Sequence, residues 1–127
     1  MKQIQAAVGV IYNESNQVLV MQRHSVEGEL WELPGGKLEP GEQPLDALHR
    51  EMQEEIGITV VDAHFIDQFD YTYPDRHVIL HAWEIVKFDG EPHGAEGQAI
   101  RWVDIAQLDR IDTHAANDPL LKLLKEA

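Results

Sequence analysis

The sequence predicts a small α+β protein. Its 127 residues suit a single domain, residues 1–127, built around one hydrophobic core. Several segments have the composition of β-strands and are separated by turn residues. One segment in the first half of the chain carries apolar residues at helical spacing, and a shorter one lies near the end. No repeat, low-complexity segment or internal linker interrupts this order.

The composition excludes several classes of protein. Hydrophobic residues make up 43% of the chain and charged residues 26%, as in ordinary globular proteins. The chain has no cysteine, which excludes disulfides and thiolate metal ligands and fits a reducing compartment. Residues 1–10 contain too short an apolar run for a signal peptide, and no segment approaches the roughly 20 apolar residues of a membrane span. We therefore expect a cytoplasmic protein.

The net charge narrows the choice of ligand. The formal charge is −13 at pH 7. Nucleic acid polymers and anionic membranes are bound by fields of Lys and Arg, so neither is an expected partner. A small polyanion would also be repelled, unless metal ions came with it and local cations met it.

The chain begins with two strands. Residues 3–12 form the first expected strand, residues 13–16 a turn, and residues 18–22 the returning strand. Arg23 then begins a polar loop that reaches Trp31. In that position Arg23 is either a solvated loop cation or a ligand clamp at the end of a strand.

A glycine-rich loop runs from Glu32 to Gly36. Two glycines after Pro34 permit positive φ angles and close approach of the backbone to another group, although a plain tight turn is the simpler interpretation. Pro40 and Gly41 form a second turn.

A helix is expected to follow these turns. Pro44 suits its first turn, where the missing N–H is no loss, and Gly57 suits its C′ cap. Arg50 can pair with Glu54 one turn further along. Apolar residues at helical spacing predict the buried face: Leu45, Leu48, Met52 and Ile56.

The same helix carries a cluster of acidic residues. Glu51, Glu54 and Glu55 occupy positions i, i+3 and i+4, so their side chains share one patch of surface. Glu51 and Glu55 flank the apolar stripe, and Glu54 lies further round. Three adjacent carboxylates repel one another unless a cation binds them. A solvated acidic face is the alternative.

The ligand types indicate which cation would bind. Clustered carboxylates, with no cysteine and no paired histidine, favour Mg²⁺ or Mn²⁺ over Zn²⁺. We therefore interpret the patch as a divalent-metal site that handles phosphate. A carboxylate left off the metal, its pKa raised by its neighbours, could take the proton from an attacking water.

The second half of the chain is rich in strand patterns. Residues 58–69 and 77–88 read as long strands separated by a turn at residues 71–76. The sequence Asp89-Gly90 is a hairpin signal at the end of the second strand. Residues 99–103 form a further short strand.

The chain ends with helical signals. Residues 104–108 could form a helical turn, and Asp118 as N-cap with Pro119 at the first helical position begins a final helix. Asn117, just ahead of that cap, reads by itself as a turn residue.

Other polar residues are less informative alone. His77 and His81 are four apart, but the strand period is two, so we interpret them as core or surface residues and not as a zinc pair. Residues 93–97 form a flexible loop whose carboxylate, Glu96, would by itself be considered solvent-exposed.

One long motif joins the loop and the helix. It consists of Gly36, five residues, Glu42, seven residues and the run REMQEEIGI at residues 50–58. It matches the signature of the Nudix family at every fixed position, and the chain resembles that family. The resemblance implies an α/β/α sandwich around a mixed β-sheet. It also implies metal-dependent hydrolysis of a nucleoside diphosphate linked to another group.

Within the family, the chain is similar along nearly its whole length to the MutT-type branch. That branch hydrolyses 8-oxo-dGTP to 8-oxo-dGMP and pyrophosphate by attack of water on the β-phosphorus. The segments that carry the similarity are residues 4–14, 73–77, 90–92, 94–98 and 116–119.

This resemblance implies roles for individual residues. Glu55 and the Gly35 carbonyl would bind Mg²⁺, for which Mn²⁺ can substitute, and Glu51, Glu54 and Glu96 would supply further ligands or the base. The implied catalytic set is Arg50, Glu51, Glu54 and Glu96. The implied substrate-binding set is Arg23, Glu32, Leu33, Pro34, Gly35, Lys37, Tyr73, Arg76 and Asn117. The amide of Asn117 can donate to one base atom and accept from another, which suits a purine edge.

Two alternatives stay open. A relative with the same chemistry on CTP or a modified dCTP is one, since Trp31-Glu32 and residues 80–83 also resemble that branch. A Nudix-shaped nucleotide sensor without turnover is the other, but such a protein should lack part of the acidic set, which is complete here. We expect a monomer that binds a nucleoside triphosphate.

Overall fold

The computed structural model describes residues 2–25, 28–110 and 118–126. Its elements, in chain order, are β1 (Lys2–Val10), β2 (Gln17–Ser25), β3 (Gly28–Glu32), β4 (Gly35–Lys37), α1 (Pro44–Ile56), β5 (Thr59–Thr72), β6 (Arg76–Asp89), β7 (Ile100–Asp104), a 3₁₀ helix η1 (Ile105–Arg110) and α2 (Asp118–Glu126). Neither helix is long and apolar enough, over the described ranges, to cross a membrane.

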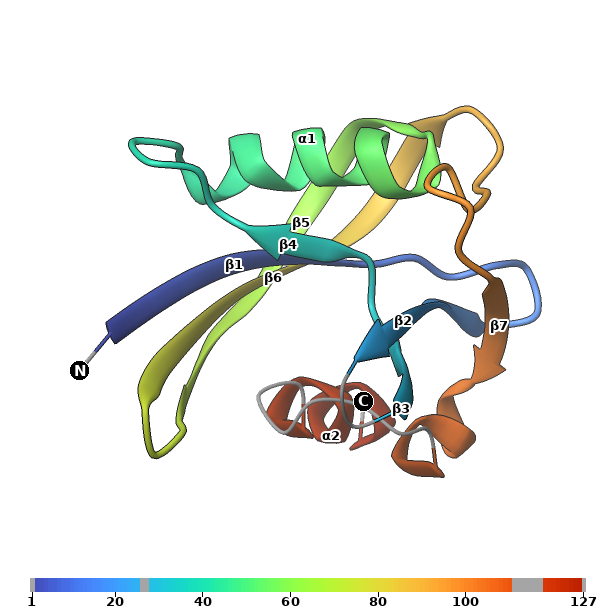
Figure 1. The fold of residues 1–127 in the computed structure, drawn as a ribbon. Coiled ribbons are helices and arrows are strands. Elements are labelled where there is room, and N and C mark those ends of the chain that lie inside the picture. The colour runs from blue at the N-terminus through green and yellow to red at the C-terminus, as the bar shows by residue number, and fades with distance from the viewer. Residues whose placement is uncertain (1, 26–27, 111–117, 127) are drawn as a thin grey trace.

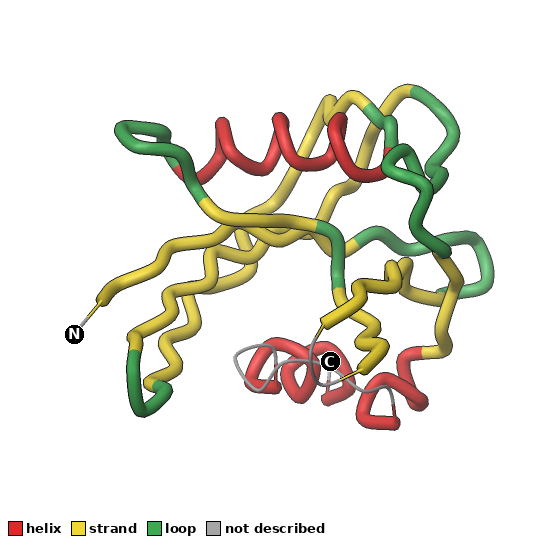
Figure 2. Tube along the Cα trace, in the orientation of Figure 1, coloured by secondary structure: helices red, strands yellow, loops and turns green. Residues whose placement is uncertain are grey.

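The strands of the described residues form two sheets. The larger has the order β4-β1-β6-β5 and is mixed, because β1 runs parallel to β6 while its pairing with β4 and the β5–β6 pairing are antiparallel. The smaller sheet, β3-β2-β7, is antiparallel. Helix α1 lies above the larger sheet and α2 lies on the opposite side (Figures 1 and 2). This arrangement confirms the α+β sandwich with a mixed sheet between helices.

The two sides of the sheet explain the apolar run at the start of the chain. Along β1 and just beyond it, Ala7 and Ile11 join the core under α1, whereas Val8 and Val10 join the core that includes α2. Side chains alternate between the faces of a strand, so a strand covered on both faces reads as continuously apolar. The strand β6 follows the same rule.

The prediction of a polar loop between Arg23 and Trp31 is wrong. Arg23 lies within β2 and faces Leu30 of β3, and Ser25 faces Gly28, so β2 and β3 pair antiparallel on both sides of residues 26–27. This pairing gives the backbone groups of both strands ladder partners, which a loop would leave to water.

The expected hairpin at Asp89-Gly90 is also wrong. Gly90 does turn the chain, with φ of 99°. However, β6 ends at Asp89, and the chain crosses to β7 in the other sheet. The hairpin partner of β6 is β5, and the backbone N–H of Tyr73 donates to the Arg76 carbonyl (2.8 Å) across their turn.

Helix α1 largely follows the prediction. Pro44 occupies its first turn, and Gly57 ends it in the left-handed conformation, with φ of 69°. Three of the four predicted stripe residues are fully buried, but Leu45 is 44% exposed. Leu45 lies in the uncovered first turn, and Ala47 contributes to the core in its place.

Two leucines on α1 test this correction. We expect Leu48→Ala to lower the free energy of unfolding by about 2–5 kcal/mol, because it leaves a cavity in a closed core. Leu45→Ala removes the same atoms from an exposed site and should lower it by less than about 1 kcal/mol. Urea denaturation of both variants measures the difference, and equal losses would contradict the assignment of Leu45 to the surface.

Candidate active site

Two glycines, expected in a loop, lie instead in the strand β4 and let it approach α1 closely. Gly35 has φ of 154°, and a Cβ there would collide with the Ala7 carbonyl. A Cβ on Gly36 would lie 2.6 Å from the carboxyl carbon of Glu51. The close approach that the glycine pair permits is therefore to the backbone of β1 and to an acidic side chain of α1, which a plain tight turn would not require.

Glu55 lies buried where β4 and α1 meet. Its side chain accepts the backbone N–H of Gly35 at Oε1 (2.9 Å) and the Arg23 Nη2 group at Oε2 (3.2 Å). Burial is the largest cause that raises the pKa of Glu55, and the nearby Glu51 also raises it. The Gly35 hydrogen bond and the Arg23 charge oppose the rise, and the resulting pKa is about 8. A carboxyl group with such a pKa exchanges protons near neutral pH.

Arg50 forms ion pairs with several other acidic residues. Its Nε and Nη2 groups donate to the two oxygens of Glu42 (2.9 and 2.8 Å), which makes a bidentate pair. Its Nη1 group donates to Glu51 (2.8 Å) and to Glu54 (3.2 Å), so the expected pairing with Glu54 is present. The guanidinium, helped by the backbone N–H of Glu39, lowers the pKa of Glu42 to about 2. Glu54 itself is about half-exposed.

The loop that carries Glu96 docks on the last turn of α1. The backbone N–H of His93 donates to the Ile56 carbonyl (3.0 Å), and that of Ala95 donates to the Glu55 carbonyl (3.1 Å). Glu96 is exposed, as the sequence suggested, but its loop is fixed beside the buried acid.

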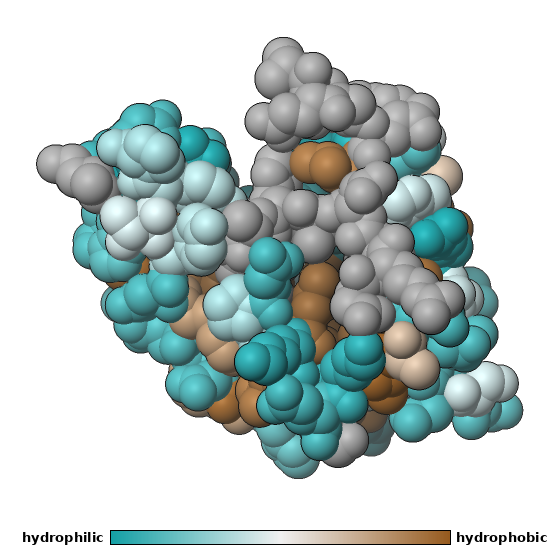
Figure 3. Space-filling model, turned by 90° about the horizontal axis from the view of Figure 1, so that it is seen from below, coloured by the Kyte–Doolittle hydropathy of each residue, from teal (hydrophilic) through white to brown (hydrophobic). Residues whose placement is uncertain are grey.

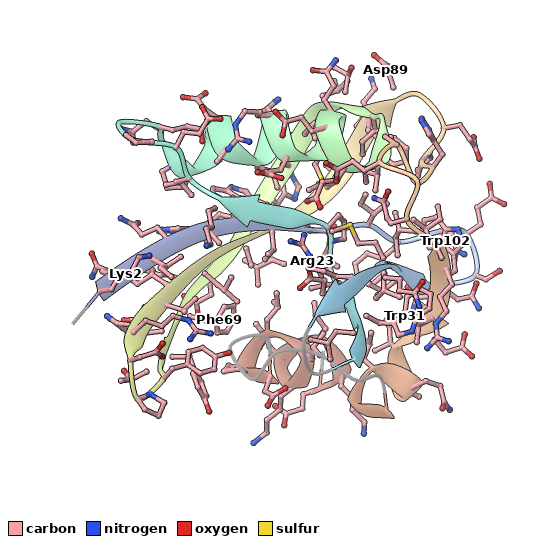
Figure 4. All side chains as sticks on the ribbon, viewed as in Figure 1. Lys2, Arg23, Trp31, Phe69, Asp89 and Trp102 are labelled. Carbon is pink, nitrogen blue, oxygen red and sulfur yellow. The ribbon has the colours of Figure 1, made fainter. Side chains whose placement is uncertain are left out.

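A cavity of about 440 Å³ opens beside these groups. Seen from below, hydrophobic residues lie in a hollow framed by hydrophilic ones (Figure 3). Lys2 lines the cavity from the outer end of β1, and Arg23 lines it from beneath β4 (Figure 4). The lining residues are Lys2, Ile4, Ala6, Val8, Arg23, Glu32, Leu33, Gly35, Gly36, Lys37, Tyr73, Arg76, Val78 and Leu80.

The lining concentrates positive charge in an acidic protein. Among the residues that the structure describes, four of the chain's ten Lys and Arg residues line the cavity, against one carboxylate, Glu32, which pairs with Arg23. Arg76 stacks over the Tyr73 ring, with its Cζ atom 4.1 Å from the ring centre. Cations and an aromatic face at an apolar hollow suit a ligand with an anionic tail and a flat ring.

The structure brings together most of the substrate-binding residues that the sequence indicated. Those that line the cavity are Arg23, Glu32, Leu33, Gly35, Lys37, Tyr73 and Arg76. Pro34 is buried, and its carbonyl accepts the N–H of Gly9 (2.9 Å). Asn117 lies outside the described residues.

Sequence reasoning missed two parts of the site. Glu42 was seen only as a fixed motif position, although it is the bidentate partner of Arg50. The floor formed by β1 was missed as well. Its signal is the alternation Lys2, Ile4, Ala6 and Val8, which places every second residue of β1 on the cavity face.

The acidic groups fit a hard cation chemically. Glu51, Glu54 and Glu55 are oxygen donors on one side of α1, and Gly36 leaves room for the Glu51 carboxylate beside β4. Among the described residues, no three acidic or histidine side chains converge on one point. The physical reason is that Arg50 and Arg23 hold the carboxylates in ion pairs, so a metal ion must compete with two guanidinium groups.

Comparison with known proteins places the chain in a family. The model of the NUDIX domain matches residues 2–124. The chain is 41% identical over 128 aligned residues, covering 98% of both chains, to the 8-oxo-dGTP diphosphatase of Escherichia coli. It is 32% identical to the CTP pyrophosphohydrolase of the same organism, covering 96% of this chain and 91% of that one.

A solved structure agrees. A MutT structure, from a study of the Aliivibrio salmonicida and Vibrio cholerae proteins, matches with a TM-score of 0.84 at 37% identity and covers 98% of each chain. The chain therefore belongs to the Nudix family, whose members are hydrolases that generally use a divalent metal ion.

The raised pKa of Glu55 predicts a pH-dependent stability. Below the ordinary value of 4.5 the group is protonated in both states. Between about pH 4.5 and pH 8 only the unfolded chain releases the proton, which favours unfolding. With a metal chelator present, we expect Glu55→Gln to be more stable than the parent by a few kcal/mol at pH 8, and the advantage should shrink to nothing near pH 4.5. Urea unfolding across this range measures it, and an advantage independent of pH would contradict the expected cause.

Glu42 should show the opposite dependence. Its folded-state pKa is lowered to about 2, so its stabilising pair with Arg50 is complete above pH 4.5 and is lost as pH falls toward 2. Glu42→Gln should therefore be less stable than the parent at pH 7, and the gap should close between pH 4.5 and pH 2. Thermal melts over that range test this, with the exposed Glu14→Gln as a control in which no gap is expected.

Proposed function

We propose that this protein hydrolyses 8-oxo-dGTP, and related oxidised purine nucleoside triphosphates, to the monophosphate and pyrophosphate with Mg²⁺. Such an activity removes mutagenic nucleotides from the pool used for DNA replication. The observation that carries the proposal is the 41% identity, over nearly the full length of both chains, to a protein named 8-oxo-dGTP diphosphatase. The acidic helix beside a cation-lined cavity supports it independently.

The cavity divides into two working regions. Arg23 and Lys37 lie on the side of the acidic helix, where they can meet the phosphate tail. Tyr73 and Arg76 form a stacked pair at the β5–β6 turn, where they can contact the nucleoside. We include the Glu32–Gly35 backbone and Asn117 in the substrate-binding set on the family resemblance.

The acidic residues supply metal ligands and the base. We propose that the Gly35 carbonyl and Glu55 hold Mg²⁺, with Mn²⁺ as a substitute. Glu51, Glu54 and Glu96 supply the further ligands, with one of these three carboxylates left off the metal as the base. When bound, the metal ion neutralises phosphate charge and stabilises the leaving group. A carboxylate that is not bound to it takes a proton from water, and that water attacks the β-phosphorus. The bond from the β-phosphorus to the bridging oxygen then breaks, which releases the nucleoside monophosphate and pyrophosphate.

Arg50 has a supporting role in this proposal. Its guanidinium joins Glu51 and Glu54 to Glu42, so it sets the positions of two carboxylates and offsets part of their charge. A cytoplasmic monomer that binds neither nucleic acid polymers nor membranes stays part of the proposal.

The pyrimidine alternative has support from one relative. The chain is 32% identical to a protein named CTP pyrophosphohydrolase. Of the two segments that suggested this branch, Trp31-Glu32 and residues 80–83, Glu32 and Leu80 line the cavity. Among the described residues, the two tryptophans of these segments do not line it. Trp31 packs under Arg101, whose Cζ atom lies 4.4 Å from the ring centre, beside β7 (Figure 4), and Trp83 lies in the core under α1. Their presence therefore reflects packing and carries no argument about the base.

A panel of triphosphates tests the function. With Mg²⁺ and added pyrophosphatase, phosphate release should give a higher kcat/KM for 8-oxo-dGTP than for dGTP or CTP, and no release without the metal. Glu54→Gln should lower kcat by about 100-fold or more, because it removes a ligand or base. Its exposed neighbour Gln53→Ala should keep the parent rate. Preference for CTP would favour the pyrimidine branch, and tight binding without release would favour a sensor.

A further inference from the structure

The side chain of Gln98 links three parts of the active site. Its Nε2 group donates to the Glu55 carbonyl (2.7 Å), and the same nitrogen lies 3.7 Å from the Met21 sulfur. Its Oε1 atom accepts the backbone N–H of Glu96 (2.9 Å). The amide therefore connects the last turn of α1, the strand β2 and the loop of Glu96.

These contacts fix the orientation of the Gln98 amide. A flipped amide would point its NH₂ group at the N–H of Glu96 and its oxygen at the carbonyl of Glu55. Both contacts would then be repulsive, since two donors or two acceptors would face each other. The half-buried side chain consequently has one favourable orientation of its amide. In that orientation it holds the backbone of Glu96 by a hydrogen bond.

The hydrogen bond from Gln98 to the Glu55 carbonyl gives a partner to a carbonyl group in the last turn of α1. The last carbonyls of an α-helix have no partner within the helix. The Glu55 carbonyl receives both the Ala95 N–H (3.1 Å) and the Gln98 amide (2.7 Å). These two donors come from either side of Glu96, so the backbone of Glu96 is held between two anchors on the residue whose side chain is the buried acid.

Two glycines in the same loop, Gly94 and Gly97, permit the close approach of Gln98. A Cβ on Gly94 would collide with the backbone oxygen of Gln98, so the loop crosses itself closely at that point. Gly97 has φ of 85°, a conformation that favours glycine, and its N–H donates to the Gly94 carbonyl (3.0 Å).

We propose that Gln98 is a positioning residue of the active site. It holds Glu96 so that this loop carboxylate reaches the same cation as the acids of α1. The inference rests on the proposed function, in which Glu96 supplies a metal ligand or the base. Without Gln98, Glu96 would keep its charge but lose one of the two anchors that fix its place, and partners that orient metal ligands commonly contribute 10- to 100-fold to affinity or activity.

Two variants and one control separate the contacts. Gln98→Ala removes both hydrogen bonds, whereas Gln98→Glu keeps an acceptor for Glu96 and loses the donor to Glu55. Gln107→Ala, at an exposed glutamine of η1, is the matched control. In the metal-free protein, amide hydrogen exchange at Glu96 should become about 10-fold faster in Gln98→Ala and remain unchanged in the control.

Metal affinity and turnover give the functional readout. The Mn²⁺ dissociation constant, measured from the free-ion paramagnetic resonance signal with a non-hydrolysable nucleotide present, should rise about 10- to 100-fold in both Gln98 variants. The kcat should fall by a similar factor with little change in the KM of the nucleotide. In a Glu96→Ala background, Gln98→Ala should have no further effect, because it acts through Glu96.

The outcomes decide between positioning and general packing. Unchanged Mn²⁺ affinity in Gln98→Ala, or effects that multiply with those of Glu96→Ala, would overturn the proposal. A parent protein that binds Mn²⁺ and nucleotide but hydrolyses no triphosphate would defeat the proposed function, while the exchange and affinity comparisons would still decide the role of Gln98.

Discussion

The site depends on the hydrogen bonds that the buried side chain of Glu55 accepts. A carboxyl group away from water is strongly destabilising unless its oxygens are hydrogen-bonded. Here one oxygen takes the Gly35 N–H and the other takes Arg23. The acid therefore fixes β4, α1 and β2 relative to one another. Its own carbonyl accepts hydrogen bonds from Ala95 and Gln98, so the same residue also fixes the loop of Glu96 on α1.

The distribution of charge makes an acidic protein able to bind an anion. Overall the chain carries −13, but Arg50 pairs with Glu51 and Glu54 of α1, and four cations line the cavity. The described residues that line the cavity therefore carry more positive than negative side chains, opposite to the balance of the whole chain. Long-range repulsion is screened over about 8–10 Å in physiological salt, whereas the pairs at the site act at contact distance. An anionic ligand would therefore meet favourable charges only within contact distance of the cavity.

The sequence predicted the local features well and the non-local ones poorly. The start of α1 at Pro44, its end at Gly57 and the arrangement of its acids follow from residues within a few positions of each other. The β2–β3 pairing was missed because residues 26–27 between the strands carry no strong turn signal, and Asp89-Gly90 was misread because a turn residue does not say which strand pairs next. The hydrogen bond from the Gly35 N–H to the Glu55 side chain, and the place of Lys2 in the cavity lining, could not be predicted without knowing how the strands pair.

The parallel ladder between β1 and β6 has a consequence for how the molecule forms. Residues 2–10 pair with residues 76–84, so the centre of the larger sheet closes only after most of the chain is available. Contacts between distant residues slow folding, because the loop between them must be ordered first. The helix α1 can begin to form earlier, since its hydrogen bonds are local. During synthesis the acidic helix would therefore exist before the floor of the cavity, and catalytic competence would be among the last properties that the chain acquires.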